Sequence, residues 1–206
     1  MQASRFDAVG AERDNGSGMP LERLTRDRLI EALNLLGTLA EQEDVTLELC
    51  IYGGGAMMLA YSAREATKDL DVLAKPSTTA LRLSGIVAQR LGLDEGWLNS
   101  DVSQFVSIDG TYAPLEIEGL EAAARKRLKI THPAASYLLA MKCLAGRSAL
   151  PGYAGDVGDI RFLIRQMGIR SVDQVEEHLQ RFYPQEALSP KVQEFIRGIL
   201  EEGSPE

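Results

Sequence analysis

The 206-residue sequence predicts a mixed α/β fold, in which a small mixed sheet with helices on its flanks precedes a helical C-terminal part. Three observations predict this class. Leucines at three- and four-residue steps near the start of the chain mark an amphipathic helix. Two short segments, 45–52 and 69–73, in which apolar residues alternate with or adjoin polar ones, are typical of strands. From Pro133 onward the sequence carries only helix signals, so the second half is expected to be helical.

The first helix and the first strand follow a segment without periodicity. Residues 1–20 mix Gly, Asp, Arg, Ser and Pro, and we expect a flexible lead-in. The leucine pattern then runs from Leu24 to Leu39 and predicts a helix with one apolar face. The run 45–52 is rich in β-branched and apolar residues, which favours a strand that is largely covered on both faces.

Three glycines, Gly53–Gly55, follow this strand directly. Glycines turn the chain easily because they tolerate positive φ. The residues AMMLAYSAR after them, 56–64, are compatible with a helix. A second strand is expected over 69–73, and Pro76 opens a helix that reaches about Leu91.

The segment 94–131 has weaker patterning. The elements expected in it are a helical turn at 96–99 and short strands at 105–108, 114–117 and 128–130.

Several residues in the second half of the sequence are typical of helix starts and ends. Pro133 suits the first position of a helix. Ser171-Val-Asp-Gln174 resembles a capping box, Ser189-Pro190 reads as an N-cap before a first-turn proline, and Gly168 suits a helix C-terminal cap. We therefore divide the chain at 20 and 131, into a lead-in (1–20), an α/β core (21–131) and a helical region (132–206). Whether both halves share one core stays open.

Composition excludes several classes of protein. Lys and Arg number 22 against 30 Asp and Glu, so the formal charge is −8, which argues against a protein whose whole surface binds nucleic acid. No apolar run approaches the roughly 18 residues of a membrane span. The two cysteines cannot build a disulfide scaffold, and the N-terminus has no apolar signal region. We expect a cytoplasmic, soluble protein without membrane contact.

The segment 52–72, YGGGAMMLAYSAREATKDLDV, carries the chemistry. The N–H groups that open a helix after Gly53–Gly55 form a natural phosphate site. Asp69 and Asp71 are two residues apart on a strand, so their carboxylates are expected on one face, with Leu70 and Val72 facing a core. Mg²⁺ binds through one or two carboxylates together with substrate phosphates. The pattern thus predicts metal-assisted attack on a nucleoside triphosphate.

This segment resembles the nucleotidyltransferase superfamily, whose signature is a Gly-Gly turn, a helix and an Asp-x-Asp strand. Together with GWLN at 96–99, YLLAMKCLAGR at 137–147 and GDVGDIRFLIRQMGI at 155–169, it resembles small bacterial nucleotidyltransferase-fold proteins related to AbiEii-type abortive-infection toxins. The resemblance covers most of residues 21–201. It implies a nucleotidyltransferase-type sheet, Mg²⁺ or Mn²⁺ as cofactor, and transfer of a nucleotidyl group from an NTP to a hydroxyl of tRNA or protein.

The resemblance also implies the site residues. Asp69 and Asp71 become the metal ligands, and Gly53, Gly54 and Gly55 become the nucleotide-phosphate turn. Lys142 would neutralise triphosphate charge, while Asp156 or Asp159 would orient Lys142 or act as a base. A role in a toxin–antitoxin or phage-defence pair, with a cognate antitoxin as partner, is implied in the same way.

A third metal-binding carboxylate is not obvious. Glu116, Glu118 and Asp109 are the candidates, with Glu116 the one we assign to the metal. If none of them faces Asp69 and Asp71, an inactive nucleotide-binding or partner-binding module, including an antitoxin, becomes the alternative.

Other residues have two interpretations each. Arg64 either reaches a nucleotide phosphate or stabilises a helix C-terminus. Lys142 lies in an apolar helix, where a lone lysine usually extends to the surface. The basic run 125–129 either contacts RNA or is a solvated surface, and Cys50 and Cys143 suit buried, reduced thiols.

Overall fold

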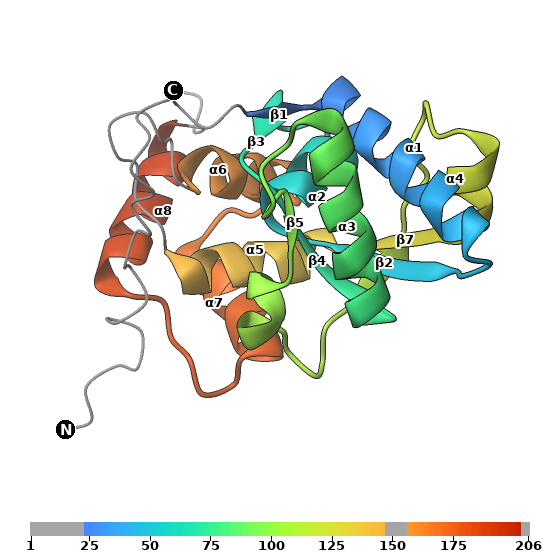
Figure 1. Cartoon of the computed structure of the whole chain (residues 1–206). Coiled ribbons are helices and arrows are strands. Elements are labelled where there is room, and N and C mark those ends of the chain that lie inside the picture. Colours follow the sequence, from blue (N-terminus) through green and yellow to red (C-terminus); the bar gives the residue numbers. More distant parts are fainter. Residues whose placement is uncertain (1–22, 147–155, 203–206) are drawn as a thin grey trace, which may run out of the picture.

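The structure is a computed structural model that describes residues 23–146 and 156–202, so the predicted lead-in over 1–20 lies outside the described residues. Its elements in chain order are β1 (Leu24–Thr25), α1 (Arg26–Gln42), β2 (Leu47–Ile51), α2 (Gly53–Leu59), β3 (Ala66–Thr67), β4 (Leu70–Lys75), α3 (Ser77–Leu91), β5 (Leu98–Asn99), the 3-10 helix η1 (Asp101–Phe105), β6 (Tyr112–Pro114), α4 (Ala122–Arg127), β7 (Leu128–Pro133), α5 (Ala135–Ala145), α6 (Val157–Gln166), α7 (Val172–Phe182) and α8 (Pro190–Glu202). The predicted mixed α/β class with a helical C-terminal part is confirmed (Figure 1).

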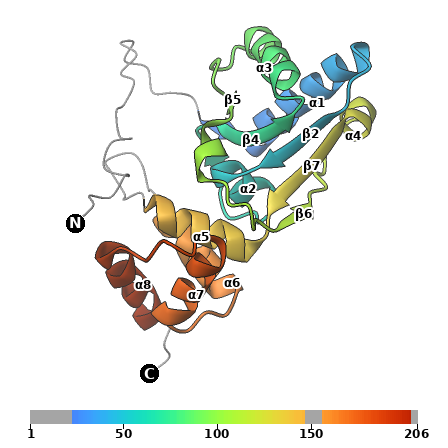
Figure 2. The same ribbon diagram turned by 90° about the horizontal axis from the view of Figure 1, so that it is seen from below.

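A five-stranded mixed sheet forms the centre of the α/β part. Its strand order is β5-β4-β2-β7-β6, and β1 pairs with β3 in a separate two-stranded sheet. Strand β2 is antiparallel to β4 and parallel to β7, while β5 is parallel to β4. Helices α1, α3 and α4 lie on one side of the sheet, and α5–α8 gather beyond the end where β7 passes into α5 (Figure 2).

The sheet buries one face and leaves the other partly open. Along β2, Leu47, Leu49 and Ile51 are buried, whereas Glu48 is exposed and Cys50 is half-buried. The expectation that this strand is covered on both faces is therefore wrong, because its side chains alternate between a core face and an open face. Strand β4 follows the same alternation, with Leu70 and Val72 fully buried and Asp71 half-buried between them.

Local capping explains where several helices begin and end. The Thr25 hydroxyl accepts a hydrogen bond from the Arg28 backbone N–H, so α1 begins after Thr25, and Leu24 belongs to β1 instead of the helix. The Ser171 and Ser189 caps are confirmed, since each hydroxyl accepts a hydrogen bond from the first turn of its helix. Gly168 has φ of +65° directly after α6, as a C-terminal cap requires.

The middle of the chain departs from the sequence expectations. Residues 98–99 form β5 instead of a helical turn, and Phe105 ends η1 instead of starting a strand. The strand expected at 114–117 is β6, which lies at Tyr112–Pro114. Helix α4 has no predicted counterpart. Pro133 ends β7, and α5 starts at Ala135, because Pro133 still pairs with Tyr112 in the sheet.

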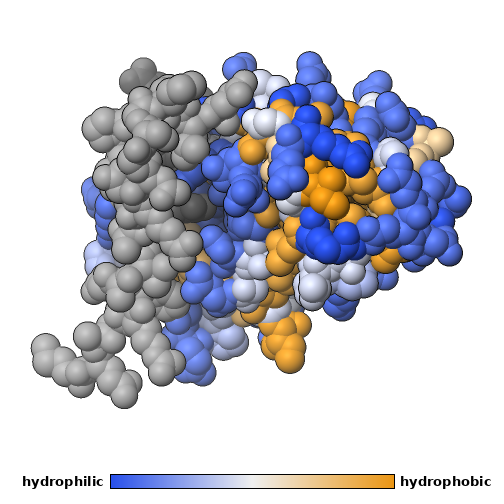
Figure 3. All heavy atoms as spheres, in the orientation of Figure 1, coloured by the Kyte–Doolittle hydropathy of each residue, from blue (hydrophilic) through white to orange (hydrophobic). Residues whose placement is uncertain are grey.

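A single apolar cluster joins residues of the α/β part and of the helical part, from Leu24 to Ile199. No helix within the described residues is long and apolar enough to span a membrane. On the face shown in Figure 3, apolar residues group near α3 and are surrounded by polar residues.

Candidate functional site

The glycine turn opens α2 directly beside β4. Gly53 has φ of +56°, and a Cβ on it would lie 2.6 Å from the Asp71 Oδ2. A Cβ on Gly54 would lie 2.4 Å from the Thr67 Oγ1. Helix α2 therefore includes the glycines, because only residues without side chains allow its first turn this close to β3 and β4. The helix ends at Leu59, so Arg64 lies in the connection to β3 and not at the predicted helix end.

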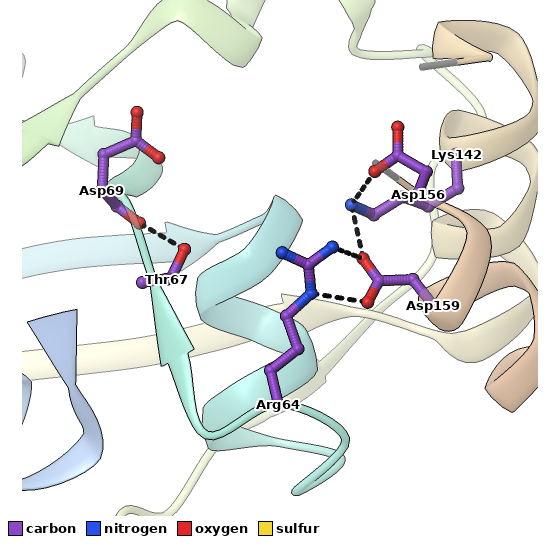
Figure 4. Close-up of polar contacts among 6 residues, drawn as sticks. All are labelled: Arg64, Thr67, Asp69, Lys142, Asp156 and Asp159. Carbon is purple, nitrogen blue, oxygen red and sulfur yellow. Dashed lines mark hydrogen bonds and ion pairs between the residues drawn. The ribbon is translucent and has the colours of Figure 1, made fainter. Parts of the chain in front are cut away.

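Backbone hydrogen bonds fix the two aspartates beside this turn. The Tyr52 N–H donates to the Asp71 carbonyl at 2.9 Å, which couples the end of β2 to β4. The Thr67 hydroxyl donates to the Asp69 carbonyl at 3.0 Å (Figure 4). Both aspartates are half-buried, whereas Leu70 is fully buried. The predicted alternation between carboxylates and core residues is confirmed at these positions.

A row of residues crosses the sheet at the level of Asp71, where Tyr52 is fully buried and Asp71 is half-buried. Asp71 pairs with Asn99 of β5 on one side and with Tyr52 on the other, and Tyr112 of β6 lies further along. The Tyr52 and Tyr112 hydroxyls are hydrogen-bonded at 3.1 Å. Burial, reinforced by Tyr112, raises the pKa of Tyr52 far above its usual value, so its hydroxyl stays neutral.

A buried charge cluster of four residues lies on the other side of α2 (Figure 4). The Lys142 Nζ lies 2.7 Å from the Asp156 Oδ1 and 2.8 Å from the Asp159 Oδ2. The Arg64 Nε and Nη2 donate to the two oxygens of Asp159, both at 2.6 Å. We call these four residues the Arg64–Lys142 cluster. It joins the segment after α2 to α5 and α6, across 95 positions of sequence.

The cluster changes the expectation for Lys142. Its side chain is 4% exposed, and its ammonium contacts two carboxylates that are 1% and 2% exposed. It does not extend to the surface, and its charge is balanced within the protein. Arg64 is the more accessible cation, with 23% of its side chain exposed. Its Nη1 lies 3.4 Å from where a Cβ of Gly54 would be, so the guanidinium faces the glycine turn.

The third carboxylate expected from the sequence is not found near Asp71. Among the described residues, no group of three or more His, Cys, Asp or Glu side chains could hold a metal ion. Glu116 and Glu118 line a separate cavity of about 620 Å³ with Arg125. Asp109 is exposed in the loop before β6. Within the part of the chain that the structure describes, Glu116 therefore forms no metal-binding group with Asp69 and Asp71.

Asn99 is the residue that the sequence reasoning missed. It stands opposite Asp71, yet its amide serves its own turn: Oδ1 accepts from the Asp101 N–H at 3.0 Å, and Nδ2 donates to the Gly96 carbonyl. A two-residue strand has no alternation pattern, so only the tertiary pairing reveals this position.

The remaining candidates include the basic run 125–129 and the two cysteines. Lys126 and Arg127 of the basic run form ion pairs with Glu41 and Asp44. Cys50 and Cys143 are free thiols; Cys143 is buried as expected, whereas Cys50 is half-buried. Burial raises the pKa of Cys143 to about 12.

Comparisons with protein-family models, with curated proteins and with solved structures return no match for this chain. The family resemblance remains an interpretation of the sequence motifs, and the function is argued from the site.

Proposed function

We propose that the chain binds a nucleoside triphosphate over Gly53–Gly55 and transfers its nucleotidyl group to a hydroxyl acceptor, tRNA or protein. The observation that carries the proposal is the contact between the glycine turn and Asp71, whose Oδ2 occupies the space next to Gly53. A phosphate bound at the turn would lie beside this carboxylate. Such an arrangement suits a polyanion only together with a cation.

The donor set fits a hard divalent cation. Asp69 and Asp71 offer carboxylate oxygens, the preferred ligands of Mg²⁺, and the Asp71 Oδ2 lies directly beside Gly53, where the backbone N–H groups that open α2 would meet a phosphate. Bound Mg²⁺ or Mn²⁺ would supply positive charge at the phosphates and polarise them. Because the Arg64–Lys142 cluster pairs two cations with two carboxylates, it contributes no net charge to offset a triphosphate.

The chain's own residues bind and orient the nucleotide in this proposal. Asp69 and Asp71 hold the cation, and Arg64 contacts phosphate from the side of α2. The acceptor oxygen forms a bond to the α-phosphorus, and the bond between the α-phosphorus and the oxygen that bridges to the β-phosphate breaks. Pyrophosphate leaves, and the proton of the acceptor hydroxyl passes to solvent. Asp156 and Asp159 orient the side chains of Lys142 and Arg64. Neither carboxylate is suited to act as a base, because both are buried and ion-paired.

A second candidate function is a binding module without catalysis, acting on a nucleotide or on a partner such as an antitoxin or toxin. Asn99 favours it, because this amide, and not a carboxylate, stands opposite Asp71. The second candidate predicts NTP binding without transfer.

Label transfer separates the two candidates. The protein is incubated with each α-³²P-labelled NTP, Mg²⁺ and a cell lysate, beside an Asp69→Asn/Asp71→Asn variant. Transfer to RNA or protein by the wild type and not by the variant supports the nucleotidyltransferase. A Glu116→Gln/Glu118→Gln variant is the matched control, because it also removes two carboxylates but from a different cavity. We expect full transfer from this control.

Two results would count against these assignments. NTP binding without any transfer supports the binding module. NTP binding that survives the Asp69→Asn/Asp71→Asn change with unaltered Mg²⁺ dependence overturns the metal assignment. A role in a toxin–antitoxin or phage-defence pair is then tested by growth arrest on expression of the wild type and of the double variant.

A further inference from the structure

The Arg64–Lys142 cluster consists of three ion pairs, two of which share the Asp159 carboxylate. Lys142 contacts Asp156 and Asp159, and Arg64 contacts Asp159. The contacts run in sequence from Asp156 through Lys142 and Asp159 to Arg64 (Figure 4). The side chains of Asp156, Lys142 and Asp159 are 1%, 4% and 2% exposed, whereas that of Arg64, at the end of the path, is 23% exposed.

Lys142 is unsuited to bind phosphate directly. To reach a ligand, its ammonium would have to leave two buried carboxylates, and buried charges without partners are strongly disfavoured. Arg64 has a guanidinium with five N–H donors, and its Nε and Nη2 contact Asp159 while its Nη1 faces the glycine turn. A bidentate pair with a fixed carboxylate sets the plane of a guanidinium. The orientation of Arg64 thus depends on Asp159, and the position of Asp159 depends on Lys142.

Resting on the proposed function, we infer that Lys142 is a positioning residue that acts on the nucleotide only through Asp159 and Arg64. Arg64 is the cation that contacts the triphosphate. Lys142 and Asp156 hold α5 and α6 in the place from which Asp159 aligns Arg64 with the glycine turn.

Each variant removes one cation together with one carboxylate of the cluster, so that every variant keeps its charge balance. Variant A is Arg64→Met/Asp159→Asn, which leaves the Lys142–Asp156 pair. Variant B is Lys142→Met/Asp156→Asn, which leaves the Arg64–Asp159 pair. The third variant combines A and B. Dissociation constants for ATP, CTP, GTP and UTP with Mg²⁺ are measured by isothermal titration calorimetry, and melting temperatures are measured without nucleotide.

Variant A should bind the preferred NTP about tenfold more weakly or worse, the loss typical of a charged hydrogen bond. Variant B should lose less, because Asp159 still holds Arg64. The combined variant should match variant A within about twofold, because Lys142 has no route to the nucleotide without Arg64.

Other patterns overturn the inference. If variant A binds like the wild type and variant B does not, Lys142 contacts the nucleotide itself. If the combined variant binds at least tenfold more weakly than variant A, the two cations act independently. If the wild type binds none of the four NTPs, both the proposed function and the positioning role of Lys142 are overturned. If the wild type binds an NTP but the losses of variants A and B add up, only the positioning role is overturned.

A matched control separates positioning from stability. Leu163 is fully buried in α6 but belongs to neither ion pair. Leu163→Ala should lower the melting temperature and leave the dissociation constant within about twofold. If Leu163→Ala weakens binding as much as variant A, the cluster affects binding only through stability and the inference fails.

Discussion

Replacing Lys142 by Met should destabilise the protein strongly. The change keeps the length of the side chain but removes the charge between Asp156 and Asp159, which are 1% and 2% exposed. Asp159 retains Arg64, whereas Asp156 loses the ammonium at 2.7 Å. Breaking a buried ion pair from one side typically costs about 3–5 kcal/mol, because a desolvated charge loses its partner. We expect a loss of free energy of unfolding in this range.

Urea denaturation measures this loss, and Trp97 provides the signal. It is the only tryptophan of the chain and is 1% exposed, so its fluorescence should change on unfolding. With a slope of about 2–3 kcal/mol per molar urea, Lys142→Met should lower the midpoint by about 1–2 M. Adding Asp156→Asn should restore most of the loss, because the remaining Asp159–Arg64 pair is balanced.

An exposed ion pair gives the comparison. Arg197 and Glu194 lie 3.1 Å apart with side chains 52% and 80% exposed, and Arg197→Met should cost less than about 1 kcal/mol. The reasoning is refuted if Lys142→Met shifts the midpoint no more than Arg197→Met. It is also refuted if Asp156→Asn deepens the loss.

Three shorter predictions concern the turn, a thiol and a tyrosine. Gly53→Ala should lower the melting temperature, because the new Cβ would lie 2.6 Å from the Asp71 Oδ2 and the residue would keep a φ of +56°. Gly85→Ala in α3 should raise the melting temperature slightly, because its Cβ would lie in open space. Cys143 should resist alkylation at pH 8 until urea unfolds the protein, because burial raises its pKa to about 12. Burial raises the pKa of Tyr137 from 10 to about 12, so the stability that this neutral hydroxyl contributes is intact below pH 10 and is lost as the pH rises towards 12. The melting temperature should therefore fall between pH 10 and pH 12. The Tyr137→Phe variant should show a smaller fall over the same range.

The parts of the site that depend on local sequence could be predicted. The strand, glycine turn, helix and second strand lie within about 30 residues, so the spacing alone brings Gly53 close to Asp71. The alternation of Leu70, Asp71 and Val72 assigns the faces of β4. Asp156 and Asp159 are three residues apart at the start of α6, a short spacing that lets both carboxylates contact Lys142.

The long-range parts could not be predicted in the same way. An isolated lysine in an apolar helix usually extends its ammonium to water, and only the position of α6 shows that Lys142 meets two carboxylates instead. Arg64 joins them from the α/β half, and no periodicity relates it to Asp159. The faces of β2 were misjudged for a related reason, since an apolar run does not show whether helices cover one side of a strand or both.

The balance of charge around α2 connects these observations to function. If Lys142 were available to phosphate, as the resemblance implies, the site would carry a cation of its own and could bind a triphosphate without metal. The structure instead neutralises Lys142 with Asp156, and Arg64 with Asp159. Asp69 and Asp71 then make the surroundings of the glycine turn acidic, which opposes a polyanion unless a divalent cation is present. The proposed site therefore requires NTP binding to depend steeply on Mg²⁺, and binding of equal strength in EDTA would refute the assignment of the nucleotide to this turn.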